Sequence, residues 1–302
     1  MDPITYIDRT TGNIEQEQVY GAKALNLLYG KGWLTSLIGV PLAHLCARLP
    51  FFSAFFGYLK TRPSSAKQII PFINNFGMDT SEFLESPKSF KTFNDFFIRK
   101  LKPAARPIAP GNETAIIPAD GRYWFYQRYD LAEGIIVKGQ RFDIPTLIGN
   151  KELAEHYSQG SLVVARLCPT DYHRFHFPCD CIPGETQLIN GWLYSVNPIA
   201  IKKDLQIFTQ NKRTLCELET EHFGKVLFLE IGATCVGAIH QTYSQDKHYN
   251  KGDEKGYFSF GASSLILLFP PNKIIFDKDL IDATKRGLEI RCLMGQSMGQ
   301  AV

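Results

Sequence analysis

The sequence lacks acidic residues over a long stretch near its N-terminus. From Gln18 to Met78 it has no Asp or Glu, but it has six basic residues among many Leu, Phe, Tyr and Trp residues. The longest uncharged run within this stretch, residues 32–47, contains sixteen residues, whereas a membrane-spanning helix needs roughly 20 apolar residues. The sequence therefore predicts no spanning helix in this stretch.

Other absences exclude further classes of protein. The net charge is only +3 and no block of Lys and Arg is present, so a nucleic-acid partner is not expected. A glycine-rich nucleotide loop, a P-loop and the Gly-x-Ser-x-Gly elbow of α/β-hydrolases are all missing. Seven cysteines at irregular spacing, without a secretory signal, are typical of free thiols in a reducing compartment. The polar, acidic N-terminus gives no sign of a cleaved targeting peptide.

Apolar residues within the acid-free stretch recur at helical spacing. The clearest series is Phe51, Phe52, Phe55, Phe56 and Leu59. Helices with an aromatic apolar face, flanking Lys and Arg and no acids are typical of a membrane interface. The same periodicity also fits two core helices that cover a globular domain. The absence of acids favours the membrane, so we expect a peripheral protein on the cytoplasmic side of the cell membrane.

The character of the sequence changes after the turn residues Pro110-Gly111. Short β-type segments separated by turn residues follow at 115–117, 123–126, 135–137, 161–167, 191–196, 225–231, 235–239 and 263–269. This pattern is typical of a β-rich domain with few helices. We therefore predict an α+β protein with an N-terminal helical, membrane-interface region at 1–111 and a β-rich catalytic domain at 112–302.

Two local features are predicted within the N-terminal part. The first fifteen residues alternate around turn signals and fit a β-hairpin. A helix pair is expected between Ala66 and Lys102, where Thr92 and Asp95 form a capping box ahead of an apolar run.

The densest cluster of ionisable side chains is the segment Asp171–His176. It contains His173 and His176, and histidine is the side chain best suited to proton transfer near neutral pH. Pro169 and Pro178 bracket the segment, so a loop or short strand is favoured over a helix. On a strand the two imidazoles would point to opposite sides and could serve different steps. Two ordinary packing histidines are the alternative.

A metal site is the main rival interpretation of this segment. Its candidate ligands are Cys168, His173, His176, Cys179 and Cys181. Thiolates and imidazoles are good zinc ligands, but the Cys-x-x-Cys pair of common zinc sites is absent. We therefore expect no metal.

Two further segments contain residue types that act in catalysis. Asp120 lies in the turn Pro118-Ala119-Asp120-Gly121, where a carboxylate can orient an imidazole through its Nδ1–H. Ser263 and Ser264 follow small residues and precede a continuous apolar strand, which permits close backbone approach to a hydroxyl. Each segment alone is an ordinary turn. Together with a histidine they are also the parts of a serine hydrolase.

Several segments, in order along the chain, resemble those of one family. They are 93–102 with 106–108, 118–121, 137–140, 171–178, 193–198, 231–237 and 251–258. The series is similar to that of the phosphatidylserine decarboxylases. The acid-free N-terminal stretch resembles the shorter branch of that family, often called type II, whose members sit on membranes.

The resemblance implies that the chain cuts itself between Ala262 and Ser263. The products would be a β chain of residues 1–262 and an α chain of residues 263–302. Members of the family usually have Gly before the serine, and here Ala262 takes that place. Counting back from Phe269 makes Ser263 the nucleophile, whereas counting forward from Gly261 would place Ala262 there and leave no nucleophile. The first register keeps a hydroxyl at the reacting position.

The resemblance also implies a role for each candidate residue. Ser263 would attack the carbonyl of Ala262, with His176 as the base and Asp120 orienting it, and would become a covalent pyruvoyl group. That group would form a Schiff base with phosphatidylserine, and His173 would protonate the carbon from which CO₂ leaves, giving phosphatidylethanolamine. Neither a metal nor pyridoxal phosphate is expected. The expected partners are phosphatidylserine in a membrane, the α and β chains of one precursor, and a second copy in a homodimer.

Two other functions remain open from the sequence. A serine hydrolase acting on lipid esters would use the same Asp120, His176 and Ser263, keep an intact chain and react with a fluorophosphonate probe. A lipid-binding relative that Ala262 prevents from maturing would also stay intact, and it would release no CO₂.

Overall fold

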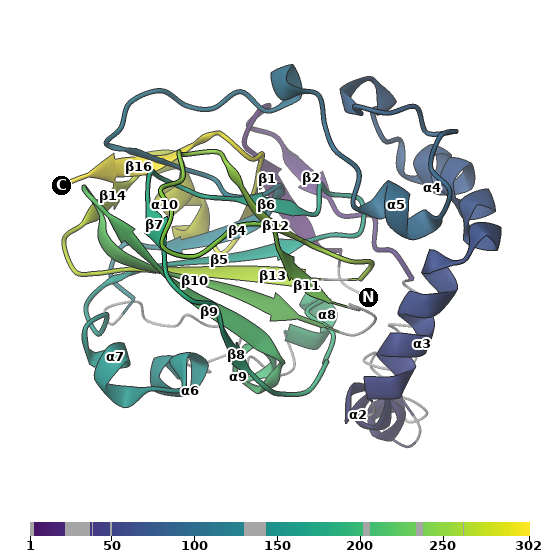
Figure 1. Cartoon of the computed structure of the whole chain (residues 1–302), viewed down its shortest axis with the longest axis horizontal. Coiled ribbons are helices and arrows are strands. Elements are labelled where there is room, and N and C mark those ends of the chain that lie inside the picture. Colours follow the sequence, from purple (N-terminus) through teal and green to yellow (C-terminus); the bar gives the residue numbers. More distant parts are fainter. Residues whose placement is uncertain are drawn as a thin grey trace.

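The computed structural model describes residues 3–21, 37, 39–48, 50–129, 143–201, 206–233, 238–261 and 263–302. Some predictions fall outside the described residues, namely those for the segment 135–140, for most of 234–239 and for Ala262. Ten of the described strands form one sheet, which is the body of a mixed α+β fold (Figure 1). Its strands, in spatial order, are β2 (Ile14–Gln16), β1 (Thr5–Asp8), β15 (Glu289–Cys292), β4 (Gly121–Tyr126), β5 (Ser161–Leu167), β13 (Ser263–Phe269), β10 (Gly224–Gly232), β9 (Arg213–Thr220) and β7 (Ile182–Pro183), with β8 (Gln187–Ile189) also paired to β9.

Two small antiparallel sheets complete the β structure. One is β11 (Ile239–Gln241), β12 (Glu254–Phe258) and β6 (Arg174–His176), and the other is β14 (Ile274–Phe276), β16 (Ser297–Ala301) and β3 (Thr114–Ile116). The described α-helices are α2 (Val40–Arg48), α3 (Pro50–Thr61), α4 (Ile69–Phe76), α5 (Phe93–Phe97), α6 (Ile144–Ile148), α7 (Lys151–Glu155), α8 (Pro198–Ile201), α9 (Ile207–Gln210) and α10 (Lys278–Lys285). Short 3₁₀ turns occupy Pro63–Gln68, Thr80–Glu82 and Pro103–Ala105. No helix within the described ranges is long and apolar enough to cross a membrane.

The central strand β13 lies between β5 and β10. All seven of its residues are buried, because the continuous apolar run from Leu265 to Phe269 packs on both faces of the sheet. The bounds predicted for β5 and β13 are confirmed. Ser263, the first residue of β13, lies opposite Gly232 on one side and Leu167 on the other.

A second apolar cluster joins the N-terminal helices to the segment that precedes β13. Its buried members are Ile69, Phe72, Ile73, Phe83, Phe90, Phe93, Phe96, Phe97 and Phe260. The side chain of Asn94 on α5 accepts a 3.0 Å hydrogen bond from the backbone N–H of Phe260. The predicted cap is present, because Thr92 Oγ1 accepts a 3.1 Å bond from the N–H of Asp95. Helix α5 therefore holds the approach to Ser263 in place.

The N-terminal hairpin is confirmed, and it belongs to the main sheet. Strands β1 and β2 pair antiparallel, and β1 also pairs in parallel with β15. The division of the chain at residue 111 stays a prediction.

The prediction of a strand at 191–196 is wrong. Trp192 makes one isolated bridge to Asn211, and no strand forms there. The buried side chain of Asn211 instead accepts from the N–H of Tyr194 at 2.9 Å and donates to its carbonyl at 2.8 Å. One amide side chain thus satisfies backbone groups that a neighbouring strand would otherwise bind.

A fully buried ion pair connects the small sheet to the main sheet. Lys255 Nζ on β12 lies 2.5 Å from Glu230 Oε1 on β10, and neither side chain is exposed. The ammonium also lies 5.0 Å from the ring centroid of Phe228 and 4.8 Å from that of Tyr243. This pair fixes β12, and β12 leads to the segment before Ser263.

Replacing Glu230 with Gln is expected to lower the free energy of unfolding by about 3–5 kcal/mol, because the charge of Lys255 would stay buried without its partner. The double variant Glu230→Leu, Lys255→Met removes both charges and should recover most of that loss. Chemical denaturation followed by circular dichroism measures both. The matched control is Glu219→Gln, at an exposed position of β9. A Glu230→Gln protein as stable as the parent would contradict this assignment.

Candidate active site

Ser263 is the first residue of the central strand, and its side chain has no exposed surface. Its hydroxyl has no hydrogen-bond partner among the described residues, and neither has that of Ser264. Consecutive side chains of a strand point to opposite faces of the sheet. Ser264 lies opposite Arg166, a member of a charged network, whereas Ser263 lies opposite Leu167 and Gly232. Ser263 therefore presents a buried hydroxyl without a hydrogen-bond partner among the described residues.

His173 lies beside the segment that precedes Ser263. Its ring centroid is 3.9 Å from that of Phe97, which in turn packs on Phe260. Its Nδ1 donates a 3.0 Å hydrogen bond to the carbonyl of Asp171, so Nε2 carries the lone pair, and Nε2 has no partner within the described part of the chain. Burial lowers the pKa of His173 to about 4, although the nearby backbone of Gly261 favours the charged ring.

His176 is placed by strand β6 and by the turn that carries Asp120. Its backbone N–H donates to the carbonyl of Pro118 at 2.8 Å. Its Nδ1 donates to the carbonyl of Gly252 at 2.9 Å, so Nε2 accepts from the hydroxyl of Tyr172 at 3.3 Å. Burial lowers the pKa of His176, while the charges of Glu254 and Asp120 act in the opposite direction. The imidazole is neutral, and its Nε2 is a base in contact with one hydroxyl.

Asp120 is buried and paired with an arginine. Its carboxylate accepts hydrogen bonds from Arg106 at 2.9 and 2.6 Å and from the N–H of Met294 at 2.9 Å. Arg106 also binds Glu82 at 3.0 Å. Asp120 is close enough to His176 to favour its charged form. The structure thus brings His176 of β6 to the turn that carries Asp120. The two side chains form hydrogen bonds with other groups and not with each other.

The roles predicted for these residues stay predictions. The structure brings His173 next to the segment before Ser263, and it brings His176 next to the Asp120 turn. The contacts of the described residues do not include one between Ser263 and either imidazole. Sequence reasoning missed Arg106, which holds Asp120, and Tyr172, which faces His176. Both belong to segments that carried the resemblance, and this was the available signal.

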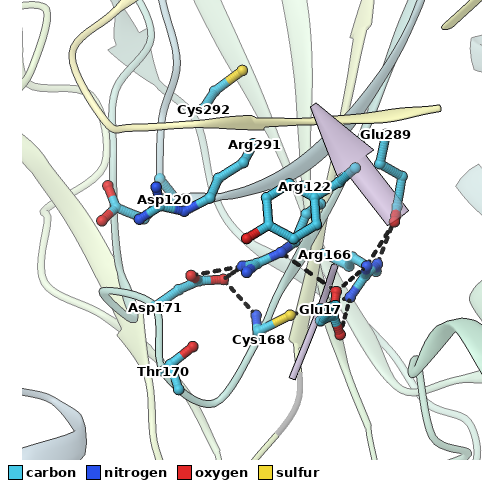
Figure 2. A network of polar contacts seen from close by, with 12 residues as sticks. Glu17, Asp120, Arg122, Arg166, Cys168, Thr170, Asp171, Glu289, Arg291 and Cys292 are labelled. Carbon is cyan, nitrogen blue, oxygen red and sulfur yellow. Dashed lines mark hydrogen bonds and ion pairs between the residues drawn. The ribbon is translucent and has the colours of Figure 1, made fainter. Parts of the chain in front are cut away.

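A buried network of charges supports the loop that carries His173 (Figure 2). Arg122 donates to Asp171 at 2.7 and 2.5 Å, and Arg166 bridges Glu289 and Glu17 at 2.6 and 2.5 Å. Burial opposes ionisation of Asp171, but the charge of Arg122 outweighs it and lowers the pKa of that carboxyl. The ionised carboxylate also accepts from the N–H of Cys168 at 2.7 Å, which closes the turn three residues before it.

A cavity of about 610 Å³ opens next to this network. Its wall includes Asp120, Asp171 and Tyr172 of the candidate site, and four arginines: Arg99, Arg106, Arg122 and Arg291. The wall also contains residues of β1, β2 and the turn after α4, among them the carboxylates of Asp8, Glu15, Asp79 and Glu82. Within the described ranges, no three His, Cys, Asp or Glu side chains come together as metal ligands.

The fold and site together describe a protein with a buried, unpartnered serine at the start of its central strand, one buried histidine beside the segment before that serine and a second beside the turn of Asp120. The family model for phosphatidylserine decarboxylase matches residues 93–300. A phosphatidylserine decarboxylase proenzyme of Chlamydia pneumoniae is 47% identical, with 98% of this chain and 97% of that protein covered. A proenzyme of Clostridium kluyveri is 43% identical, with 98% of this chain and 98% of that protein covered. One of Chlamydia trachomatis serovar D is 39% identical, with 98% of this chain and 96% of that protein covered. The chain therefore belongs to the phosphatidylserine decarboxylase family.

Proposed function

We propose that this protein converts phosphatidylserine to phosphatidylethanolamine and CO₂ by means of a pyruvoyl group made from its own Ser263. The observation that carries the proposal is the buried hydroxyl of Ser263, which has no partner among the described residues and starts the central strand. The relatives support it because they are named proenzymes, a term for chains that need processing. When formed, the pyruvoyl group supplies a carbonyl that condenses with an amine and accepts the electrons released with CO₂.

Self-cleavage needs a base for the Ser263 hydroxyl. The oxygen attacks the carbonyl carbon of Ala262, the peptide C–N bond breaks and an ester forms. Elimination then breaks the bond between the ester oxygen and the side-chain carbon of residue 263, which frees residues 1–262. Water next replaces the backbone nitrogen of residue 263, which leaves as ammonia, and the pyruvoyl carbonyl remains. We assign the proton transfer to His176, because Asp120 and Glu254 favour its charged form and its Nε2 is a lone-pair nitrogen.

The second step needs a group that returns a proton to carbon. His173 fits it because its Nε2 has no partner in the described chain and it lies beside Gly261, next to the cut. The substrate amine arrives as an ammonium and must lose a proton before it can react. Nε2 of His173 can take that proton and give it to the carbon once CO₂ has left.

A lipid substrate requires contact with a bilayer, and we propose that α2 and α3 provide it. The exposed apolar residues there are Leu42, Leu45, Phe55, Phe56, Tyr58 and Leu59. Phe55 and Tyr58 are each more than half exposed, at 51% and 56%. Aromatic side chains and the flanking Arg62 suit an anionic membrane surface. We therefore propose a peripheral protein, and we keep the cytoplasmic side of the membrane as a prediction from the sequence.

The first prediction concerns the covalent state of the chain. Intact mass of the purified protein should give two chains, 1–262 and 263–302, the smaller one lighter by one ammonia than its sequence because a pyruvoyl group replaces serine. Ser263→Ala should remain one chain, and the matched control Ser264→Ala should still be cut. A persistent full-length wild-type chain would sink the proposal. Reaction of that chain with a fluorophosphonate would then favour a hydrolase.

The second prediction separates the two histidines. His176→Ala should block cleavage, because no base would activate Ser263. His173→Ala should be cut but should release CO₂ at least about 100-fold more slowly, the usual contribution of a general acid or base. Gel analysis of the chains and trapping of labelled CO₂ measure the two steps. Normal cleavage of His176→Ala combined with loss of cleavage in His173→Ala would reverse the roles.

The third prediction concerns the membrane surface. Phe55→Glu with Phe56→Glu should weaken cosedimentation with vesicles that contain phosphatidylserine, because charged side chains resist insertion between lipid headgroups. The control is Ile275→Glu on β14, which is 59% exposed and lies at the opposite end of the molecule from α3 (Figure 1). Equal binding of the α3 variant and the control would refute the docking surface.

A further inference from the structure

Arg99 is a buried cation without a carboxylate partner in the described chain. It follows α5 and is only 4% exposed. Its Nη2 donates to the carbonyls of Thr170 and Asp171 at 3.0 and 3.2 Å. Its Nε and Nη1 have no acceptor among the described residues. Burial lowers the pKa of Arg99 to about 10, so the guanidinium is still charged at neutral pH.

The other arginines of the cavity wall are all neutralised. Arg106 pairs with Asp120 at 2.6 Å, Arg122 with Asp171 at 2.5 Å and Arg291 with Asp8 at 2.6 Å. A buried charge is costly unless it is paired, so the lone guanidinium of Arg99 calls for a counter-ion.

Two aromatic rings hold the guanidinium of Arg99 in place. Its Cζ lies 4.8 Å from the ring centroid of Phe83 and 5.1 Å from that of Phe96. The faces of these rings attract a cation, but they supply neither a full negative charge nor a hydrogen-bond acceptor of carboxylate strength. The rings therefore fix the position of the cation. The charges of Asp120 and Asp171 favour its charged form from a distance, but both carboxylates pair directly with other arginines.

Arg99 lies beside the residue that we assign to the second chemical step. The carbonyl of Asp171 accepts from Arg99 Nη2 at 3.2 Å and from His173 Nδ1 at 3.0 Å. The guanidinium and the imidazole are thus separated by a single shared acceptor. Arg99 also lines the 610 Å³ cavity, and so do Thr170 and Asp171, whose carbonyls accept from it.

We infer that Arg99 binds the phosphodiester of the lipid headgroup while the serine moiety faces His173. The inference rests on the proposed function and names the part of the substrate that the cavity recognises. In a glycerophosphoserine headgroup the phosphorus and the reacting carbon are only a few covalent bonds apart, which suits a guanidinium and an imidazole that share the carbonyl of Asp171 as acceptor. Guanidinium groups bind phosphate oxygens through strong, charge-assisted hydrogen bonds.

The chemistry of the reaction favours the phosphate over the substrate carboxylate as the occupant. A cation held on the carboxylate would stabilise a charge that disappears as CO₂ leaves, and would raise the barrier. The phosphodiester keeps its charge throughout, so its contact with Arg99 contributes binding without opposing the reaction.

The test uses the mature enzyme and phosphatidylserine in detergent micelles of fixed composition. Arg99→Gln keeps a donor for the carbonyl of Asp171 but removes the charge, and Arg99→Lys keeps the charge. The matched control, Lys102→Gln, removes an exposed cation nearby. The readouts are cleavage into two chains, kcat and KM, and the inhibition constants of glycerophosphoethanolamine and of inorganic phosphate.

Arg99→Gln should be cut like the wild type. It should raise both KM and the inhibition constant of glycerophosphoethanolamine about 10- to 100-fold, the loss expected for hydrogen bonds to a charged group. Arg99→Lys should recover part of this binding, and Lys102→Gln should match the wild type.

Three results would overturn the inference. Unchanged KM in Arg99→Gln would show that Arg99 does not bind the substrate. A lower kcat with unchanged KM and inhibition constant would show that Arg99 only positions the loop of His173. If inorganic phosphate inhibits the wild type but not Arg99→Gln, while the KM for phosphatidylserine is the same in both proteins, the site would be assigned to free phosphate.

Two further measurements keep the inference testable in other circumstances. If Arg99→Gln is not cut, the test uses the wild type alone and compares its inhibition constants for ethanolamine and for glycerophosphoethanolamine. Equal constants would mean that the phosphate contributes nothing to binding and would overturn the inference. If the wild type releases no CO₂ from phosphatidylserine, the proposed function fails. Binding of glycerophosphoethanolamine to wild type and Arg99→Gln, measured by calorimetry, then still tests the site.

Discussion

Burial of strand β13 between β5 and β10 is the constraint on which the rest of the structure depends. The strand is apolar along its length from Leu265, and every one of its residues is buried. Ser263 lies at its first position, so the backbone that carries this hydroxyl is held by strand pairing on both sides. After cleavage at this point, residues 263–302 would remain bound, because β13 and β15 both lie between strands of the larger fragment.

The two histidines are buried among different charges. Burial lowers the pKa of both; the charges of Glu254 and Asp120 favour a proton on His176, whereas on His173 the charge of Asp171 favours a proton and that of Arg99 opposes it. An anion bound at Arg99 would remove that penalty and let His173 hold a proton during turnover. The polar wall of the cavity thus connects substrate binding to the chemistry proposed for His173.

Sequence reasoning predicted the parts of the fold that depend on local pattern. The apolar runs of β5 and β13 and the cap at Thr92 were found because each has its signal within a few residues. The partners of the buried charges could not be predicted from the sequence, because Asp120 meets Arg106 and Lys255 meets Glu230 only through the register of distant strands and turns. The strand expected at 191–196 failed for a similar reason, because the side chain of Asn211 replaces the pairing.

The central claim is that a carbonyl derived from Ser263 carries out the decarboxylation. The most direct measurement is the mass of both chains after incubation with phosphatidylserine and cyanoborohydride, which reduces a carbonyl–amine adduct to a stable bond. We expect a lipid-derived amine to become attached to the first residue of the 263–302 chain, and the 1–262 chain to remain unmodified. Attachment to the larger chain, or to neither chain while CO₂ is released, would contradict it.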